Sequence, residues 1–165
     1  MQTQRSKSPS RVEKSLYDRL GGIYAIATVI DRFSNSLIDN PVVGQNSQNE
    51  FLKDWHRNEL ERLPGLKWMR TLWVCDLAGG PYKFVPTVAG KCPFSLENAH
   101  FEFEISPEEF DAVAKELSNA LDYYNIPRKE KNEVLAVFSA HKFEVNEGYF
   151  VENNLQTKHI LCQFK

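Results

Sequence analysis

Residues 99–111 read AHFEFEISPEEFD, and this stretch decides the fold class that the sequence predicts. Ser106 is a good helix N-cap, Pro107 suits the first turn, and Glu109 stands where a capping box closes. Apolar and acidic residues alternate before the cap, but the run is too short to build a sheet on. The stretch therefore predicts the start of an amphipathic helix, with His100 just ahead of it.

Outward from this stretch, apolar residues recur at helical spacing along most of the chain. We expect helices over residues 23–39, 66–78, 107–124 and 128–143, and a solvated helix or an ordered loop over residues 50–63. Asn40-Pro41 and Gly79-Gly80-Pro81 end the first two helices, because proline cannot continue a helix. Pro64-Gly65 is expected to interrupt the chain before the second helix. Because no convincing alternating strand is present, the predicted fold class is all-α.

The composition is that of a globular protein. Of the 165 residues, 42% are hydrophobic and 25% are charged, which excludes a disordered chain as the main interpretation. The net charge of −2 gives no basic excess for binding nucleic acid. No apolar run is long enough to predict a membrane span. The three cysteines form no CxxC pair, so neither a disulfide framework nor a structural zinc site is expected, and a reducing compartment fits best.

The sequence predicts one folded domain with an extension at each end. We expect a disordered N-terminal extension over residues 1–13, the domain over residues 14–147 and a C-terminal tail over residues 148–165. The N-terminal extension is polar and basic and has no apolar segment, so it is not a secretory signal. The predicted location is cytoplasmic, or the interior of an organelle if the basic extension acts as a transit peptide.

The chain has four histidines, and His100 differs from the others. Apolar residues flank it on both sides: Phe94, Leu96, Phe101 and Phe103. A histidine in such surroundings is more often a structural group than a ligand, and the alternative is that it ligates haem iron axially. His56 lies in a charged stretch and is expected at the surface. The sequence holds no hydrolase, nucleotide-binding or zinc-protease motif.

Five blocks of sequence, in order along residues 15–145, resemble the truncated (2-on-2) globin family and are group I-like. They are residues 15–22 (SLYDRLGG, similar to the family's LYxRLGG), Asp31-Arg32-Phe33 with Asp39-Asn40-Pro41, residues 79–84 (GGPYKF), Ala99-His100 with residues 105–111, and residues 121–127. The resemblance implies an all-α, 2-on-2 helical sandwich that holds haem b, with His100 as the proximal ligand of the iron.

The resemblance also implies which residues bind the cofactor. They are His100, Phe33, Leu66, Met69, Arg70, Trp73, Tyr82, Phe84, Phe94, Leu96, Leu117 and Phe138. The implied function is reversible binding of oxygen, nitric oxide or carbon monoxide, in storage, sensing or nitric oxide detoxification. A nitric oxide dioxygenase-type side activity would need a reductase, which the sequence does not identify.

The distal side of the implied pocket departs from the family. Ser34 stands where the family has a tyrosine that hydrogen-bonds bound oxygen, and Leu66 and Met69 offer no hydrogen. We therefore expect bound oxygen to be held weakly. Two alternatives remain open. Arg70 turns inward, although its charge prefers solvent or a haem propionate, or Met69 binds the iron itself.

A second interpretation belongs to a different functional class. It is a globin fold that has lost haem and serves as an interaction or assembly subunit of a larger complex, as the extensions and the missing distal residues favour. A third interpretation, a pH-sensing module that uses His100 and His141, has little specific support. Haem binding is preferred because His100 stands in its flanking motif.

Overall fold

The computed structural model describes residues 13–83 and 99–153, and these residues form helices and turns without a strand. In chain order the elements are α1 (Leu16–Arg19), α2 (Gly22–Ile38), α3 (Glu50–Asn58), the 3-10 turn η1 (Leu60–Arg62), α4 (Leu63–Leu77), the 3-10 turn η2 (Phe101–Phe103), α6 (Pro107–Tyr123), α7 (Arg128–Ala140), α8 (Lys142–Val145) and α9 (Glu147–Glu152). The all-α prediction is confirmed. Over the described ranges, no helix combines the length and the apolar character that crossing a membrane requires.

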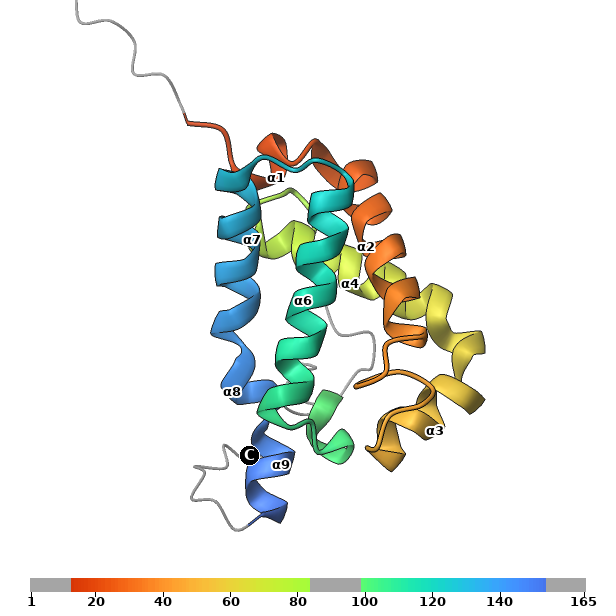
Figure 1. The fold of residues 1–165 in the computed structure, drawn as a ribbon. Coiled ribbons are helices and arrows are strands. Elements are labelled where there is room, and N and C mark those ends of the chain that lie inside the picture. Colours follow the sequence, from red (N-terminus) through yellow and green to blue (C-terminus); the bar gives the residue numbers. More distant parts are fainter. Residues whose placement is uncertain (1–12, 84–98, 154–165) are drawn as a thin grey trace, which may run out of the picture.

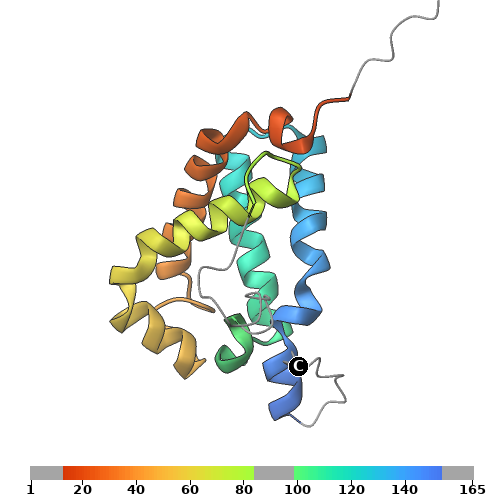
Figure 2. The same ribbon diagram turned by 180° about the vertical axis from the view of Figure 1, so that it is seen from behind.

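The four long helices form two pairs that pack on each other. α2 has its most extensive contacts with α4 and then with α6, and α6 also packs along α7. Figure 1 shows α6 between α2 and α7, and Figure 2 shows α4 crossing these helices on the opposite side of the molecule. This arrangement is a 2-on-2 helical sandwich, with the hydrophobic core between the two pairs.

α2 supplies the central face of the core. Its buried residues recur at helical spacing: Ile26, Val29, Ile30, Phe33, Ser34 and Leu37. The helix ends before Asn40, whose side-chain oxygen accepts hydrogen bonds from the backbone N–H groups of Val42 (2.9 Å) and Val43 (3.3 Å). The helix predicted over residues 23–39 is confirmed, and this side-chain cap helps to fix the turn that follows it.

The helix start predicted at Ser106 is confirmed, and the interruption predicted at Pro64-Gly65 is wrong. The Ser106 hydroxyl accepts a hydrogen bond from the Glu109 backbone N–H at 3.2 Å, and the Glu109 carboxylate accepts one from the Ser106 N–H at 2.7 Å. This is the predicted capping box of α6. The interruption predicted at Pro64-Gly65 is absent, because both residues lie in the first turn of α4. A proline is tolerated there since its missing N–H has no partner within the helix.

The C-terminal helices continue further than the sequence predicts. A single helix is expected to residue 143, whereas α7 ends at Ala140 and the short helices α8 and α9 follow. α9 includes residues 148–152, which the sequence assigns to the tail. Residues 154–165 and residues 1–12 lie outside the described residues.

α9 packs tightly on η2. The Asn146 side-chain N–H, at the start of α9, donates to the Ile105 carbonyl at 2.6 Å. A Cβ atom on Gly148 would lie 2.0 Å from the Phe101 carbonyl oxygen, so only glycine permits this approach. The turn that follows His100 is therefore held in place by the C-terminal helix (Figure 1).

Arg19 connects the first helix of the fold to α7. Its guanidinium donates to the Glu130 carboxylate at 2.6 Å, and it forms a second ion pair with Glu133. The hydrogen bonds from Arg19 hold the pKa of both carboxyl groups below their ordinary value. The network thus stabilises the fold while both glutamates are ionised.

Replacing this arginine should destabilise the protein in a pH-dependent way. We expect Arg19→Met to lower the melting temperature at neutral pH. A lowered pKa in the folded state gives stability that is present above the unfolded pKa and lost as pH falls through the folded pKa. The difference from wild type should therefore shrink below about pH 4.3, the ordinary glutamate pKa. Thermal unfolding, followed by circular dichroism at neutral pH and below about pH 4.3, measures this difference in melting temperature.

The control is Arg62→Met, which removes an exposed pair with Glu59. A melting-temperature difference that does not change with pH would contradict the assignment.

Two glycine substitutions should have opposite effects on stability. A Cβ atom on Gly44 would lie 2.2 Å from the Ile38 carbonyl oxygen and 2.5 Å from that of Leu37. We expect Gly44→Ala to reduce the free energy of unfolding by about 1–3 kcal/mol, the usual effect of overpacking. At Gly65, in α4, nothing lies within 4 Å of the added atom. Gly65→Ala should raise the stability by about 0.5–1 kcal/mol, because alanine favours the helix. Denaturant unfolding measures both changes in the free energy of unfolding. Equal changes in the two variants would contradict the close packing of Gly44 against the end of α2.

Candidate functional site

α4 carries apolar residues on two sides, and only one side packs into the core. Thr71 and Cys75 are its buried residues. Thr71 lies one turn from Lys67, whose ammonium binds Asp31 of α2 at 2.6 Å, so this side faces α2. A helix that is apolar on both sides is normally covered on both. The second side of α4 is therefore the candidate binding surface.

This second side is a stripe of four residues at helical spacing, which we call the α4 stripe: Leu66, Met69, Arg70 and Trp73. All four are only partly covered by the described residues. Three of them are apolar, and the fourth is a cation on a long apolar stem. The α4 stripe thus offers a broad apolar surface with one charge, which suits a flat apolar group that carries a polar centre.

Arg70 turns inward from the α4 stripe to α2. Its Nη1 donates a hydrogen bond to the hydroxyl of Ser34 at 3.0 Å, and its guanidinium carbon lies 5.5 Å from the centre of the Phe33 ring. Ser34 is 1% exposed and Phe33 is 4% exposed. The structure therefore corrects the expectation that the Arg70 charge prefers solvent or a propionate. Of the two alternatives for the distal side, the inward orientation of Arg70 is the one that this geometry matches.

Arg70 remains a cation at neutral pH. Burial lowers the pKa of its guanidinium to about 10, because the charged form loses hydration. That value is still well above neutrality. The inner end of the α4 stripe therefore carries a partly desolvated positive charge.

His56 lies in the interior, and its predicted surface position is wrong. The residue is 8% exposed, and its Nδ1 lies 2.8 Å from the Leu52 carbonyl oxygen. Nδ1 is therefore the protonated nitrogen that donates to this carbonyl. Burial lowers the pKa of His56, and the nearby Arg70 charge lowers it as well, so the ring is neutral at neutral pH. The signal in the sequence was the spacing of Leu52 and His56, which places both on one face of α3.

His100 lies directly before η2. Its side chain is partly buried. The turn that follows is fixed from two directions, since Asn49 at the start of α3 donates to the Phe103 carbonyl at 2.9 Å and α9 packs on Phe101. This support fixes the backbone at His100. Three predicted site residues, Phe84, Phe94 and Leu96, lie outside the described residues.

The structure brings three other predicted residues together. Trp73, Leu117 and Phe138 line one hollow between α4, α6 and α7. The Trp73 ring stands edge-on to the His141 ring at 5.2 Å, and Phe138 stacks on Phe110 at 4.9 Å. Tyr82 does not line this hollow. It lies against Tyr17 of α1, with the ring centres 6.3 Å apart, and is 39% exposed.

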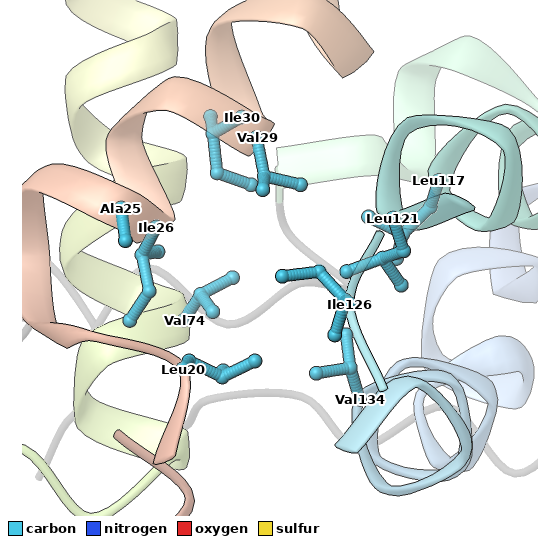
Figure 3. A pocket seen from close by; sticks show the side chains of 10 residues that line it. All are labelled: Leu20, Ala25, Ile26, Val29, Ile30, Val74, Leu117, Leu121, Ile126 and Val134. Atoms are coloured by element: carbon cyan, nitrogen blue, oxygen red, sulfur yellow. The ribbon is translucent and has the colours of Figure 1, made fainter. Parts of the chain in front are cut away.

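A second hollow lies between α2, α4, α6 and α7 (Figure 3). Its lining is apolar throughout: Leu20, Ala25, Ile26, Val29, Ile30, Val74, Leu117, Leu121, Ile126 and Val134. Because the lining offers no charge or hydrogen-bonding side chain, this hollow has no means to orient a polar substrate.

The donor chemistry narrows the kinds of cofactor that the site fits. Within residues 13–83 and 99–153, no three or more His, Cys, Asp or Glu side chains lie together as a metal site. A single imidazole such as His100 suffices for a metal that brings its other ligands with it, as haem iron does. The apolar α4 stripe and the aromatic rings of Phe33 and Trp73 suit the porphyrin. The residues present therefore fit haem.

Comparisons with known proteins agree with this fold. The 2/2 hemoglobin from Synechococcus sp. PCC 7002, solved in the cyanomet state with covalently attached heme, is 21% identical, with a TM-score of 0.65 over 81% of this chain and 99% of that chain. The truncated hemoglobin from Tetrahymena pyriformis, in its Fe(III) form, is 20% identical, with a TM-score of 0.60 over 80% of this chain and 97% of that chain. No curated protein sequence matches significantly.

A match between the sequence and a family model identifies the family. The model of the bacterial-like globin family matches residues 15–147, which include every described helix from α1 to α8. This match spans most of the sequence and runs through both layers of the sandwich. The chain therefore belongs to the bacterial-like globin family.

Proposed function

We propose that this globin binds haem b between the α4 stripe and His100, and that it reversibly binds a diatomic gas at the iron. Haem is the cofactor that membership of this family implies. When bound, haem would supply an iron that can bind an imidazole and a diatomic gas. The observation that carries the proposal is the α4 stripe, an apolar helix face that the described residues leave partly open.

His100 serves as the axial ligand in this proposal. The turn after it is held by Asn49 and α9, so its backbone does not have to be ordered when haem binds. Pre-ordering of this kind reduces the entropy lost on binding. Leu66, Met69 and Trp73 cover the porphyrin face from the other side and exclude water.

Arg70 and Ser34 form the polar part of the gas side. A bound gas that carries partial negative charge accepts a hydrogen bond from the Arg70 guanidinium, which α2 holds in place through Ser34. Such bonds to a charged donor contribute about 1.5–3 kcal/mol. Oxygen storage, sensing and nitric oxide detoxification all begin with this binding step.

The His100→Gly variant tests the axial ligand. We expect it to lose most of its haem affinity, or to give an altered ferrous absorption spectrum, because the iron loses its protein ligand. Added imidazole should restore the wild-type ferrous spectrum by occupying the same position. Absorption spectra of the ferrous and carbonmonoxy forms measure both effects.

The matched control is His141→Gln, since His141 forms a partly exposed pair with Glu144. This variant should keep the wild-type spectra. Unchanged haem affinity and an unchanged ferrous spectrum in His100→Gly would contradict the assignment. A wild-type protein that stays colourless with added hemin would favour the haem-free assembly subunit instead.

A further inference from the structure

The turn between His100 and α6 contains a strained backbone position. Glu104 has a φ of 48° and a ψ of 42°, in the left-handed region that favours glycine. Its N–H donates to the Phe101 carbonyl at 3.2 Å, which closes the turn. A side chain persists in this region only where the surrounding structure holds the backbone in place. The turn therefore depends on contacts from other elements.

The start of α9 supplies two of these contacts. The Asn146 side-chain N–H donates to the Ile105 carbonyl at 2.6 Å. Gly148 lies against the Phe101 carbonyl, so that an added Cβ atom would be 2.0 Å from its oxygen and 2.8 Å from its carbon. We call these two residues, Asn146 and Gly148, the α9 contact. It holds the turn at both ends, once beside His100 and once beside the cap of α6.

The α9 contact is made although it leaves a polar atom unsatisfied. Asn146 is 1% exposed, and its Oδ1 is buried without a hydrogen-bond partner among the described residues. Buried polar atoms are normally paired. An unpaired acceptor on one side of the contact and a strained Glu104 on the other are both unfavourable. Such local departures concentrate where function requires a fixed geometry.

We infer that the α9 contact positions the axial histidine and thereby sets the strength of the bond between His100 and the haem iron. The inference rests on the proposed function, in which His100 is that ligand. Asn146 and Gly148 act through the backbone, because Phe101 directly follows His100 and a shift of its carbonyl moves the base of the imidazole. The match to the family model ends at residue 147, so Gly148 lies outside the matched part of the chain.

Two variants of the full chain test this positioning role. Gly148→Ala must open the contact with the Phe101 carbonyl, and a binding geometry is lost by displacements beyond about 0.5 Å. Asn146→Leu removes the hydrogen bond to Ile105 without adding a clash, so it serves as the test if Gly148→Ala does not fold. Both variants keep His100 itself.

The first readout is the bond to the iron. In resonance Raman spectra of the ferrous, haem-loaded variants, we expect the iron–histidine stretching band to broaden or move to lower frequency, because the bond is weaker. Transfer of hemin to an excess of apomyoglobin should become about 10–100-fold faster, as is usual when the support of a metal ligand is removed.

The second readout needs no haem. Amide hydrogen exchange of the haem-free protein reports on the turn itself, since the Glu104 N–H is bonded to the Phe101 carbonyl. We expect this amide to exchange faster in Gly148→Ala than in wild type. The loss of the α9 contact is thereby measured separately from the loss of haem.

Two controls separate positioning from general stability. Val151→Ala changes α9 at a side chain that is 38% exposed and should leave the stretching band unchanged. Arg19→Met lowers stability at α1, at the opposite end of the molecule from α9 (Figure 1), and should also keep the wild-type band.

Each result decides the inference. A wild-type band and wild-type hemin transfer in Gly148→Ala, with faster exchange at Glu104, would overturn the positioning role and leave the proposed function standing. Unchanged exchange would overturn it too, because the contact would then not hold the turn. An equal band shift in Arg19→Met would also overturn it, since instability alone would explain the shift. Failure of the wild type to take up haem would overturn the proposed function and this inference together.

Discussion

The packing of α4 against α2 is the interaction on which the rest of the structure depends. It buries Thr71 and Cys75 and leaves the α4 stripe only partly covered by the described residues. A helix with apolar residues on only one side would pack into the core and offer no second apolar surface for a ligand. α4 has a second apolar side, so the same helix closes the core and, in the proposed function, forms one wall of the binding site. Stability and function therefore share one element, and the register between α4 and α2 determines both.

That register also accounts for the polar part of the site. Arg70 lies at the boundary between the two sides of α4, close enough to α2 to reach Ser34. A shorter side chain at position 34 leaves space that the guanidinium occupies, where the family has a tyrosine. In the proposed function, the donor to a bound ligand is therefore a cation on α4 and not a neutral hydroxyl on α2. His56 on α3 borders this space without adding charge.

Much of the fold could be predicted from local signals. Helical spacing and the cap at Ser106 predicted α2 and α6, because caps and apolar faces depend on residues close in sequence. Pro64-Gly65 was misread as a break, since the effect of a proline depends on whether it falls in the first turn or the interior of a helix. The site was harder to predict. Arg70 is held inward by contacts with α2, and His56 is buried. Charge patterns along one helix do not show which side a neighbouring helix will cover.

The central claim is that the second side of α4 and His100 together hold one haem. The most direct measurement is a titration of the haem-free protein with hemin, followed by absorption and by thermal unfolding. The account predicts that a Soret band saturates at one equivalent and that the melting temperature rises, because a ligand that binds only the folded state stabilises it. An absorption that increases without saturation, together with an unchanged melting temperature, would contradict the account.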